Sequence, residues 1–186
     1  MKLIKEEIKN INLGYFDSII KEFPYLVNDG EHYRVLTYLS FLFNNELIVD
    51  AGTCQGHSCL ALAQNKNNLV YTYDIVPKDL NHITENYKNV TKYIKDINLE
   101  TDDILEKAKI ILLDIDPHDG KIEKIFYDKL CTTKFNGILI CDDINLNEGM
   151  KNFWNSIDKE KYDISHIGHW SGTGIVNFSN EKIEIL

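Results

Sequence analysis

The chain has 186 residues, of which 44% are hydrophobic and 26% are charged. These values are typical of a globular protein and exclude an intrinsically disordered chain and a disulfide-stapled mini-protein. Domains average roughly 150 residues, so we expect one domain. The net charge is −9 and the chain has no run of Lys and Arg, so nucleic acid is not an expected partner.

The sequence carries no sign of export or of membrane insertion. Residues 1–10 include acidic side chains and lack the apolar centre of a signal peptide. No apolar stretch approaches the roughly 20 residues that a membrane-spanning helix needs. No Cys-x-x-Cys pair occurs, and Cys141 lies in an apolar run, as a buried free thiol does. Reduced cysteines in a core favour a cytoplasmic protein.

The first 45 residues have the apolar spacing of helices. Apolar side chains recur at helical spacing over residues 3–11 and again over 16–23. Pro24 and the cluster 28–30 break this pattern, and a further helix is predicted over 31–44. We expect residues 1–45 to form a helical lid over a core of residues 46–186, within one domain overall.

After residue 45, short apolar runs alternate with amphipathic segments. Strands are predicted over 47–49, 69–73, 110–113 and 138–141, with a weaker candidate at 90–94, and helices over 58–64, 79–87 and 121–130. Continuously apolar strands are typical of a parallel sheet covered by helices on both faces. Residues 162–166 and 173–178 alternate in polarity around a Gly-rich turn, which predicts an antiparallel hairpin. The expected fold is α/β, a Rossmann-like doubly wound and mostly parallel sheet with N-terminal helices.

Each predicted parallel strand is followed by an aspartate. In an open parallel sheet the ligand crevice lies outside the carboxyl ends of the strands, so these side chains should line one edge. A single aspartate there is often only a turn residue or a helix cap. Five like charges at one edge would repel each other, which favours a bound cation or hydroxyl donors such as those of a ribose. The five residues are Asp50, Asp74, Asp96, Asp114 and Asp142.

The segment 47–58 reads as a strand, a glycine-bearing loop and the start of a helix. Glycines let the backbone approach a ligand closely, and the helix start offers unpaired N–H groups. Gly52 and Gly56 are four positions apart, whereas the outer glycines of a dinucleotide fingerprint are about five apart. No Gly-Lys-Ser/Thr follows, which excludes a P-loop. Asp50 before the loop would repel a pyrophosphate and suits a ligand that carries an ammonium group.

This Asp-x-Gly-x-x-x-Gly segment resembles motif I of the class I S-adenosylmethionine-dependent methyltransferases. The later strand ends follow in that family's order, over about residues 45–180. The resemblance implies that Asp74 holds the ribose hydroxyls of S-adenosylmethionine and that Asp96 meets the adenine amino group. The full set of cofactor-binding residues that it implies is Asp50, Gly52, Thr53, Gly56, Ser58, Asp74 and Asp96.

Three further carboxylates resemble the metal site of the small-molecule and sugar O-methyltransferases. Asp114 and Asp142 are 28 positions apart, a strand–helix–strand passage, and Asp143 follows directly. Catechol-type enzymes commonly carry Asp-Asn at the second position, so Asp-Asp is closer to the sugar-directed group. The resemblance implies a Mg²⁺ ion on Asp114, Asp142 and Asp143. The alternative is that Asp143 caps the next helix and that Asp114 acts alone as a base.

A proton acceptor is expected in the loop after the fourth strand. His118 follows Pro117 there, and we expect Asp114 or His118 to take the proton from the substrate hydroxyl. The tail histidines His166 and His169 are expected to be structural.

The sequence therefore predicts methyl transfer from S-adenosylmethionine to the hydroxyl of a small molecule or sugar, with Mg²⁺ assistance left open. An NAD-dependent oxidoreductase is the main alternative, although the glycine spacing and Asp50 disfavour it. A non-catalytic S-adenosylmethionine-binding protein and a metal-dependent hydrolase that uses residues 114–119 are also open. We expect a small-molecule acceptor, no nucleic acid and no membrane partner, and we leave a homo-oligomer open.

Overall fold

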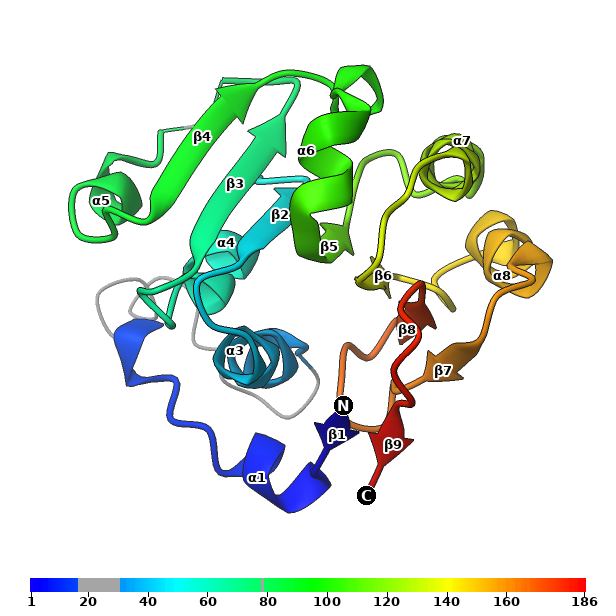
Figure 1. The fold of residues 1–186 in the computed structure, drawn as a ribbon, viewed down its shortest axis with the longest axis horizontal. Coiled ribbons are helices and arrows are strands. Elements are labelled where there is room, and N and C mark those ends of the chain that lie inside the picture. The colour runs from blue at the N-terminus through cyan, green and yellow to red at the C-terminus, as the bar shows by residue number, and fades with distance from the viewer. Residues whose placement is uncertain (17–30, 78) are drawn as a thin grey trace.

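The computed structural model describes residues 1–16, 31–77 and 79–186, so most of the helix predicted over 16–23 lies outside the described residues. Within these ranges the centre of the molecule is a seven-stranded sheet of order β4-β3-β2-β5-β6-β8-β7 (Figure 1). Its strands are β2 (Leu47–Ala51), β3 (Leu69–Asp74), β4 (Val90–Ile94), β5 (Ala108–Leu113), β6 (Ile138–Asp142), β7 (Lys161–Asp163) and β8 (Thr173–Asn177).

The pairing of the strands confirms the predicted fold class. Strands β2 to β6 pair in parallel, and β8 is antiparallel to both β6 and β7. From β2 the chain first builds outward through β3 and β4, and then continues on the other side of β2 with β5 and β6. This reversal creates a switch point between β2 and β5, where open α/β sheets form their ligand crevice.

Helices cover both faces of the sheet (Figure 1). The side chains of the strands belong to two separate apolar clusters, one on each face of the sheet, because alternate side chains point to opposite faces. Ile110 and Leu112 pack into the first cluster, whereas Ile111 and Leu113 pack into the second. The first face carries α3 (Tyr33–Leu42), α4 (His57–Leu62) and α5 (Asn81–Thr84), and the second carries α6 (Asp102–Lys107), α7 (Lys121–Thr132) and α8 (Glu148–Ser156).

The two chain ends lie side by side. Strand β1 (Lys2–Leu3) pairs in parallel with β9 (Glu184–Ile185), and the termini are close together in Figure 1. The helix predicted over 3–11 is therefore shorter, α1 (Lys5–Lys9), because Leu3 belongs to a strand. Ile8 of α1 packs into the same apolar cluster as α3 and α4. Phe16, in the short helix η1 (Gly14–Phe16), packs there too. Closure of residues 1–45 over a ligand stays a prediction.

The helix predicted over 79–87 is a single turn. Asp79 Oδ1 accepts a hydrogen bond from the amide of Asn81 where α5 begins, and the chain turns again before β4 starts at Val90. Over the described ranges, no helix combines the length and the apolar character that crossing a bilayer requires.

Candidate active site

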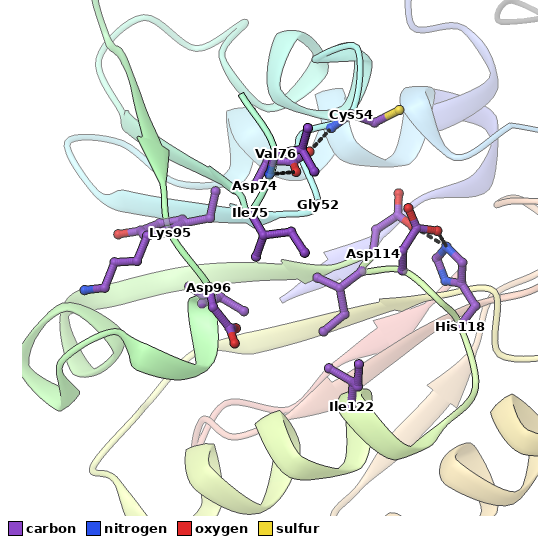
Figure 2. Close-up of a pocket in the computed structure, with 14 residues that line it drawn as sticks. Gly52, Cys54, Asp74, Ile75, Val76, Lys95, Asp96, Asp114, His118 and Ile122 are labelled. Atoms are coloured by element: carbon purple, nitrogen blue, oxygen red, sulfur yellow. Dashed lines mark hydrogen bonds and ion pairs between the residues drawn. The ribbon is translucent and has the colours of Figure 1, made fainter. Parts of the chain in front are cut away.

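A pocket of about 320 Å³ opens at the carboxyl ends of β2 to β5, at the switch point (Figure 2). Its volume is at the lower end of the range of small-molecule sites. Five of the residues predicted for cofactor binding or catalysis line it, together with an aliphatic wall from the segments after β3, β4 and β5 and from α7. The lining residues are Gly52, Cys54, Tyr73, Asp74, Ile75, Val76, Lys95, Asp96, Ile97, Asp114, Ile115, Asp116, His118 and Ile122.

The glycine loop is held between β3 and β5. The amides of Gly52 and Thr53 both donate to the carbonyl of Tyr73, at 2.9 and 3.0 Å. Gly52 has a φ of +102°, and a Cβ there would lie 1.6 Å from the backbone oxygen of Asp114. Only glycine fits this position, since both the backbone angle and the neighbouring strand exclude a side chain.

Asp50 lies beneath this loop and does not line the pocket. It is fully buried, and its Oδ2 accepts from Thr72 Oγ1 at 2.6 Å. Thr72 Oγ1 in turn lies 2.6 Å from Thr53 Oγ1. Burial raises the pKa of Asp50 to about 6, although hydrogen bonds from Thr72 and Ser58 oppose the rise. Asp50, Thr53 and Ser58 therefore support the loop from within the core.

Asp74 and Asp96 face the pocket from the ends of β3 and β4 (Figure 2). Asp74 accepts from the amide of Cys54 at 3.0 Å and from the amide of Val76 at 2.8 Å, with a different oxygen each time. Asp96 Oδ1 accepts from the amide of Asn98 at 2.8 Å. Each carboxylate oxygen can accept more than one hydrogen bond. Both side chains are thus fixed in place and can still accept from hydroxyl or amino groups.

Gly56 is the N-cap residue directly before α4 and has a left-handed conformation, with a φ of +82°. A Cβ there would lie 2.5 Å from Ile83 Cδ1 and 2.8 Å from Leu80 Cδ2. The residue therefore allows α4 to pack closely against the segment around α5, and it is not among the residues that line the pocket.

Asp114 and His118 lie beside each other at the opposite side of the pocket (Figure 2). His118 Nε2 is 3.8 Å from Asp114 Oδ1 and 3.5 Å from Asp116 Oδ1. Burial of its carboxyl group, and then the negative charge of Asp142, raise the pKa of Asp114 well above its usual range. A carboxylate with a raised pKa is a stronger base near neutral pH.

Asp142 lies between two imidazole rings and is 4% exposed. His32 Nδ1 is 3.0 Å from its Oδ1, and His169 Nδ1 is 3.3 Å from its Oδ2. Burial alone would raise the pKa of Asp142, but the two rings hold it well below its usual range. Burial likewise works against protonation of His169, yet the carboxylates of Asp142 and Asp143 raise its pKa to about 10.

Asp143 is buried beside the same cluster. Its Oδ1 accepts from Ser171 Oγ and lies 3.3 Å from His169 Nδ1, and its Oδ2 lies 3.5 Å from His118 Nδ1. It does not cap α8, because Asn147 accepts from the amide of Met150 at that helix start.

The predicted metal ligands fall into two separate groups. The ligand atoms of Asp114, His118 and Asp143 all lie within 4.8 Å of one another. The ligand atoms of Asp142, His32 and His169 form a second group within the same distance. Mg²⁺ prefers oxygen ligands in a nearly octahedral arrangement, whereas each group contains imidazole and both oxygens of Asp142 already face rings. This arrangement does not fit a Mg²⁺ ion shared by the three carboxylates.

His32 was not among the predicted site residues, and only a structural role was predicted for His169. His32 is 110 residues from its partner Asp142, so no local motif joins them. The available signal was electrostatic. Buried carboxylates at one edge require groups of opposite charge, and the 6 histidines, which can take up a proton near neutral pH, are candidates for this role beside the 20 Lys and Arg residues.

Comparison with known proteins supports the fold. No protein-family model and no curated protein sequence matches the chain. An S-adenosylhomocysteine-bound methyltransferase from Podospora anserina is 15% identical with a TM-score of 0.59, and the match covers 89% of this chain and 86% of that one. A putative caffeoyl-CoA O-methyltransferase from Staphylococcus aureus is 15% identical with a TM-score of 0.58, covering 86% and 91%. A putative rRNA methylase from Clostridium thermocellum is 17% identical with a TM-score of 0.57, covering 80% and 96%.

Two of these three descriptions name an acceptor, and the two acceptors differ, but all three proteins are similar to this chain in fold. At identities of 15 to 17% the likeness concerns architecture. The chain has the Rossmann-like fold of the S-adenosylmethionine-dependent methyltransferases.

Proposed function

We propose that the chain transfers a methyl group from S-adenosylmethionine to a hydroxyl group of a small molecule. The observation that carries the proposal is the shared pocket, in which the Gly52 loop, two acceptor carboxylates and the Asp114–His118 pair meet at the switch point of the sheet. The fold and the S-adenosylhomocysteine bound to a similar protein support the same cofactor.

The residues of the pocket fit this cofactor. Asp74 keeps acceptor capacity for the two ribose hydroxyls, and Asp96 keeps it for the adenine amino group. Ile75 and Ile97 line the same pocket and offer an apolar surface to a flat base. When bound, the cofactor supplies an electrophilic methyl group on a positively charged sulfur.

Asp114 and His118 act on the acceptor in the proposed reaction. The acceptor oxygen bonds to the methyl carbon, the carbon–sulfur bond breaks, and the hydroxyl proton passes to Asp114 or to His118 Nε2. Removal of this proton matters because a neutral hydroxyl is a poor nucleophile, and the raised pKa of Asp114 favours the transfer. The rest of the catalysis is alignment of the two reactants.

The charge of the chain supports a small acceptor over RNA. One similar protein is described as a putative rRNA methylase, but proteins that bind RNA attract its phosphates with basic surfaces. The present chain has 29 acidic and 20 basic residues, so its average surface repels phosphates.

Titration calorimetry with S-adenosylhomocysteine and, separately, with NADH tests the proposal. We expect S-adenosylhomocysteine to bind at one site and NADH to give no saturable heat. Binding of NADH alone would instead support an oxidoreductase. A second assay follows transfer from S-adenosylmethionine with a labelled methyl group to phenols, sugars and RNA. Label in a phenol or sugar supports the proposal, whereas binding without transfer to any of them indicates a non-catalytic binding protein.

A further inference from the structure

Three carboxylates and three imidazoles alternate in one chain of contacts that runs from the pocket into the core. We call this the imidazole–carboxylate chain. Its members come from the start of α3, the loop after β5, the end of β6 and the turn before β8. From the pocket inward they are Asp114, His118, Asp143, His169, Asp142 and His32.

The outer half of the chain begins at the pocket. Asp114 Oδ1 lies 3.8 Å from His118 Nε2, and the other nitrogen of that ring lies 3.5 Å from Asp143 Oδ2. The His118 ring thus stands between two carboxylates and faces each with a different nitrogen. Like charges on Asp114 and Asp143 are separated by a group that can carry the opposite charge.

The inner half is closer and more buried. His169 Nδ1 lies 3.3 Å from Asp143 Oδ1 and 3.3 Å from Asp142 Oδ2, and Asp142 Oδ1 lies 3.0 Å from His32 Nδ1. His32 is 3% exposed and Asp142 is 4% exposed. The other ring nitrogen of His169 lies 3.5 Å from Glu31 Oε2, so this ring also has an acidic partner at the start of α3.

We propose that the imidazoles of His118, His169 and His32 take the place of a divalent cation at this edge of the sheet. His118 and His169 each stand between two of the carboxylates that a shared metal ion would have to join. Both oxygens of Asp142 already face the rings of His32 and His169, so a shared ion would compete with these rings for that carboxylate. The proposal rests on the proposed function in one respect, namely that this edge is the acceptor side of the pocket. Its consequence is a site whose carboxylates are neutralised by the protein itself.

Metal titration of the wild-type protein is the first test. After treatment with EDTA and dialysis, Mg²⁺ and Mn²⁺ are titrated by calorimetry, and the melting temperature is followed over the same concentrations. We expect no saturable heat and a shift in melting temperature below about 1 °C, because a ligand stabilises only the state that it binds. A saturable signal that disappears in Asp142→Asn would overturn the proposal.

A double-mutant cycle is the second test. We expect His169→Asn to lower the melting temperature by about 5 °C or more, because it removes the ring that faces two buried carboxylates at once, Asp142 and Asp143. In an Asp142→Asn background the same change should have less than half that effect, since one of the two charges is already absent. Equal effects in the two backgrounds would contradict the proposal.

His166→Asn is the matched control, because His166 lies in the same turn and is exposed. Its melting temperature should stay within about 1 °C of wild type. Neither test measures methyl transfer, so a failure here would leave the proposed function standing, and a failure to bind S-adenosylhomocysteine would leave this inference standing. The metal titration uses only wild type and Asp142→Asn, so it decides the matter if His169→Asn does not fold.

Discussion

Asp74 is the residue on which a bound cofactor should depend most strongly. It faces the pocket from the end of β3 and keeps acceptor capacity on both oxygens. A hydrogen bond to a charged group contributes about 1.5–3 kcal/mol. With two ribose hydroxyls as partners, Asp74→Ala should weaken S-adenosylhomocysteine binding by about a hundredfold or more in calorimetry.

Asp79→Ala is the control for this substitution. Asp79 also accepts a hydrogen bond from a backbone amide, that of Asn81, but it is exposed and is not among the pocket-lining residues. Its affinity for S-adenosylhomocysteine should equal that of wild type. Unchanged affinity in a folded Asp74→Ala protein would show that the cofactor is placed wrongly.

Asp50 should make the free energy of unfolding depend on pH. Its pKa in the folded protein, about 6, is above the ordinary value of 3.8, so between these pH values the folded state binds the proton more tightly than the unfolded state does. The free energy of unfolding contributed by Asp50 therefore falls as the pH rises through this range. From pH 4 to 7, wild type should lose on the order of 2 kcal/mol relative to Asp50→Asn.

Urea unfolding at several pH values measures this difference. Both proteins share all other titrating groups, so only the difference between their two curves reports on Asp50. Parallel curves for wild type and Asp50→Asn would mean that the carboxyl group is not desolvated in solution.

At the scale of the elements, the contact between the ends of β2 and β5 holds the pocket together. A Cβ on Gly52 would lie 1.6 Å from the backbone oxygen of Asp114, which is not a flexible side chain that can move aside. Gly52→Ala should therefore separate the two strand ends, weaken S-adenosylhomocysteine binding at least about tenfold, and lower the melting temperature by several degrees.

Gly14→Ala is a suitable comparison, because the nearest atoms to its Cβ belong to the side chain of Asn12 at the exposed start of η1. It should bind S-adenosylhomocysteine as wild type does. Normal affinity and stability of Gly52→Ala would reduce Gly52 to an ordinary turn residue.

The elements that sequence patterns predicted best are those buried on both faces. The strands predicted at 47–49 and 110–113 lie within the buried strands β2 and β5. The weaker candidate at 90–94 coincides with the edge strand β4, which is only partly buried. Helix α8 was missed although its signals are present. Asn147 caps it, and Met150, Phe153 and Trp154 share its buried face. The β1–β9 pair could not be predicted, because it joins opposite ends of the chain and has no local signature.

The candidate site was predictable where its residues are neighbours in the sequence or follow parallel strands, and not where its residues come from distant segments. Asp114 and His118 are four positions apart in one loop, so their proximity follows from local sequence. Asp74 and Asp96 reach one pocket because parallel strands end at one edge. The partners of Asp142 come from the start of α3 and the turn before β8, and only the folded chain brings these segments together.

At the scale of the whole molecule, the net charge of −9 predicts that the protein does not bind nucleic acids. An RNA oligonucleotide should show no saturable binding even at low ionic strength, where phosphate contacts are strongest. Fluorescence anisotropy with a labelled RNA and a basic RNA-binding protein as positive control measures this. Salt-sensitive binding by the present chain would favour an RNA acceptor over a small molecule.

We propose that the pocket at the switch point holds S-adenosylmethionine. A crystal structure of the protein grown with S-adenosylhomocysteine and MgCl₂ tests it most directly. We predict the ribose hydroxyls at Asp74, the adenine near Asp96, and the sulfur directed toward Asp114 and His118. A structure with the ligand elsewhere, or with this pocket empty at saturating ligand, would contradict the account.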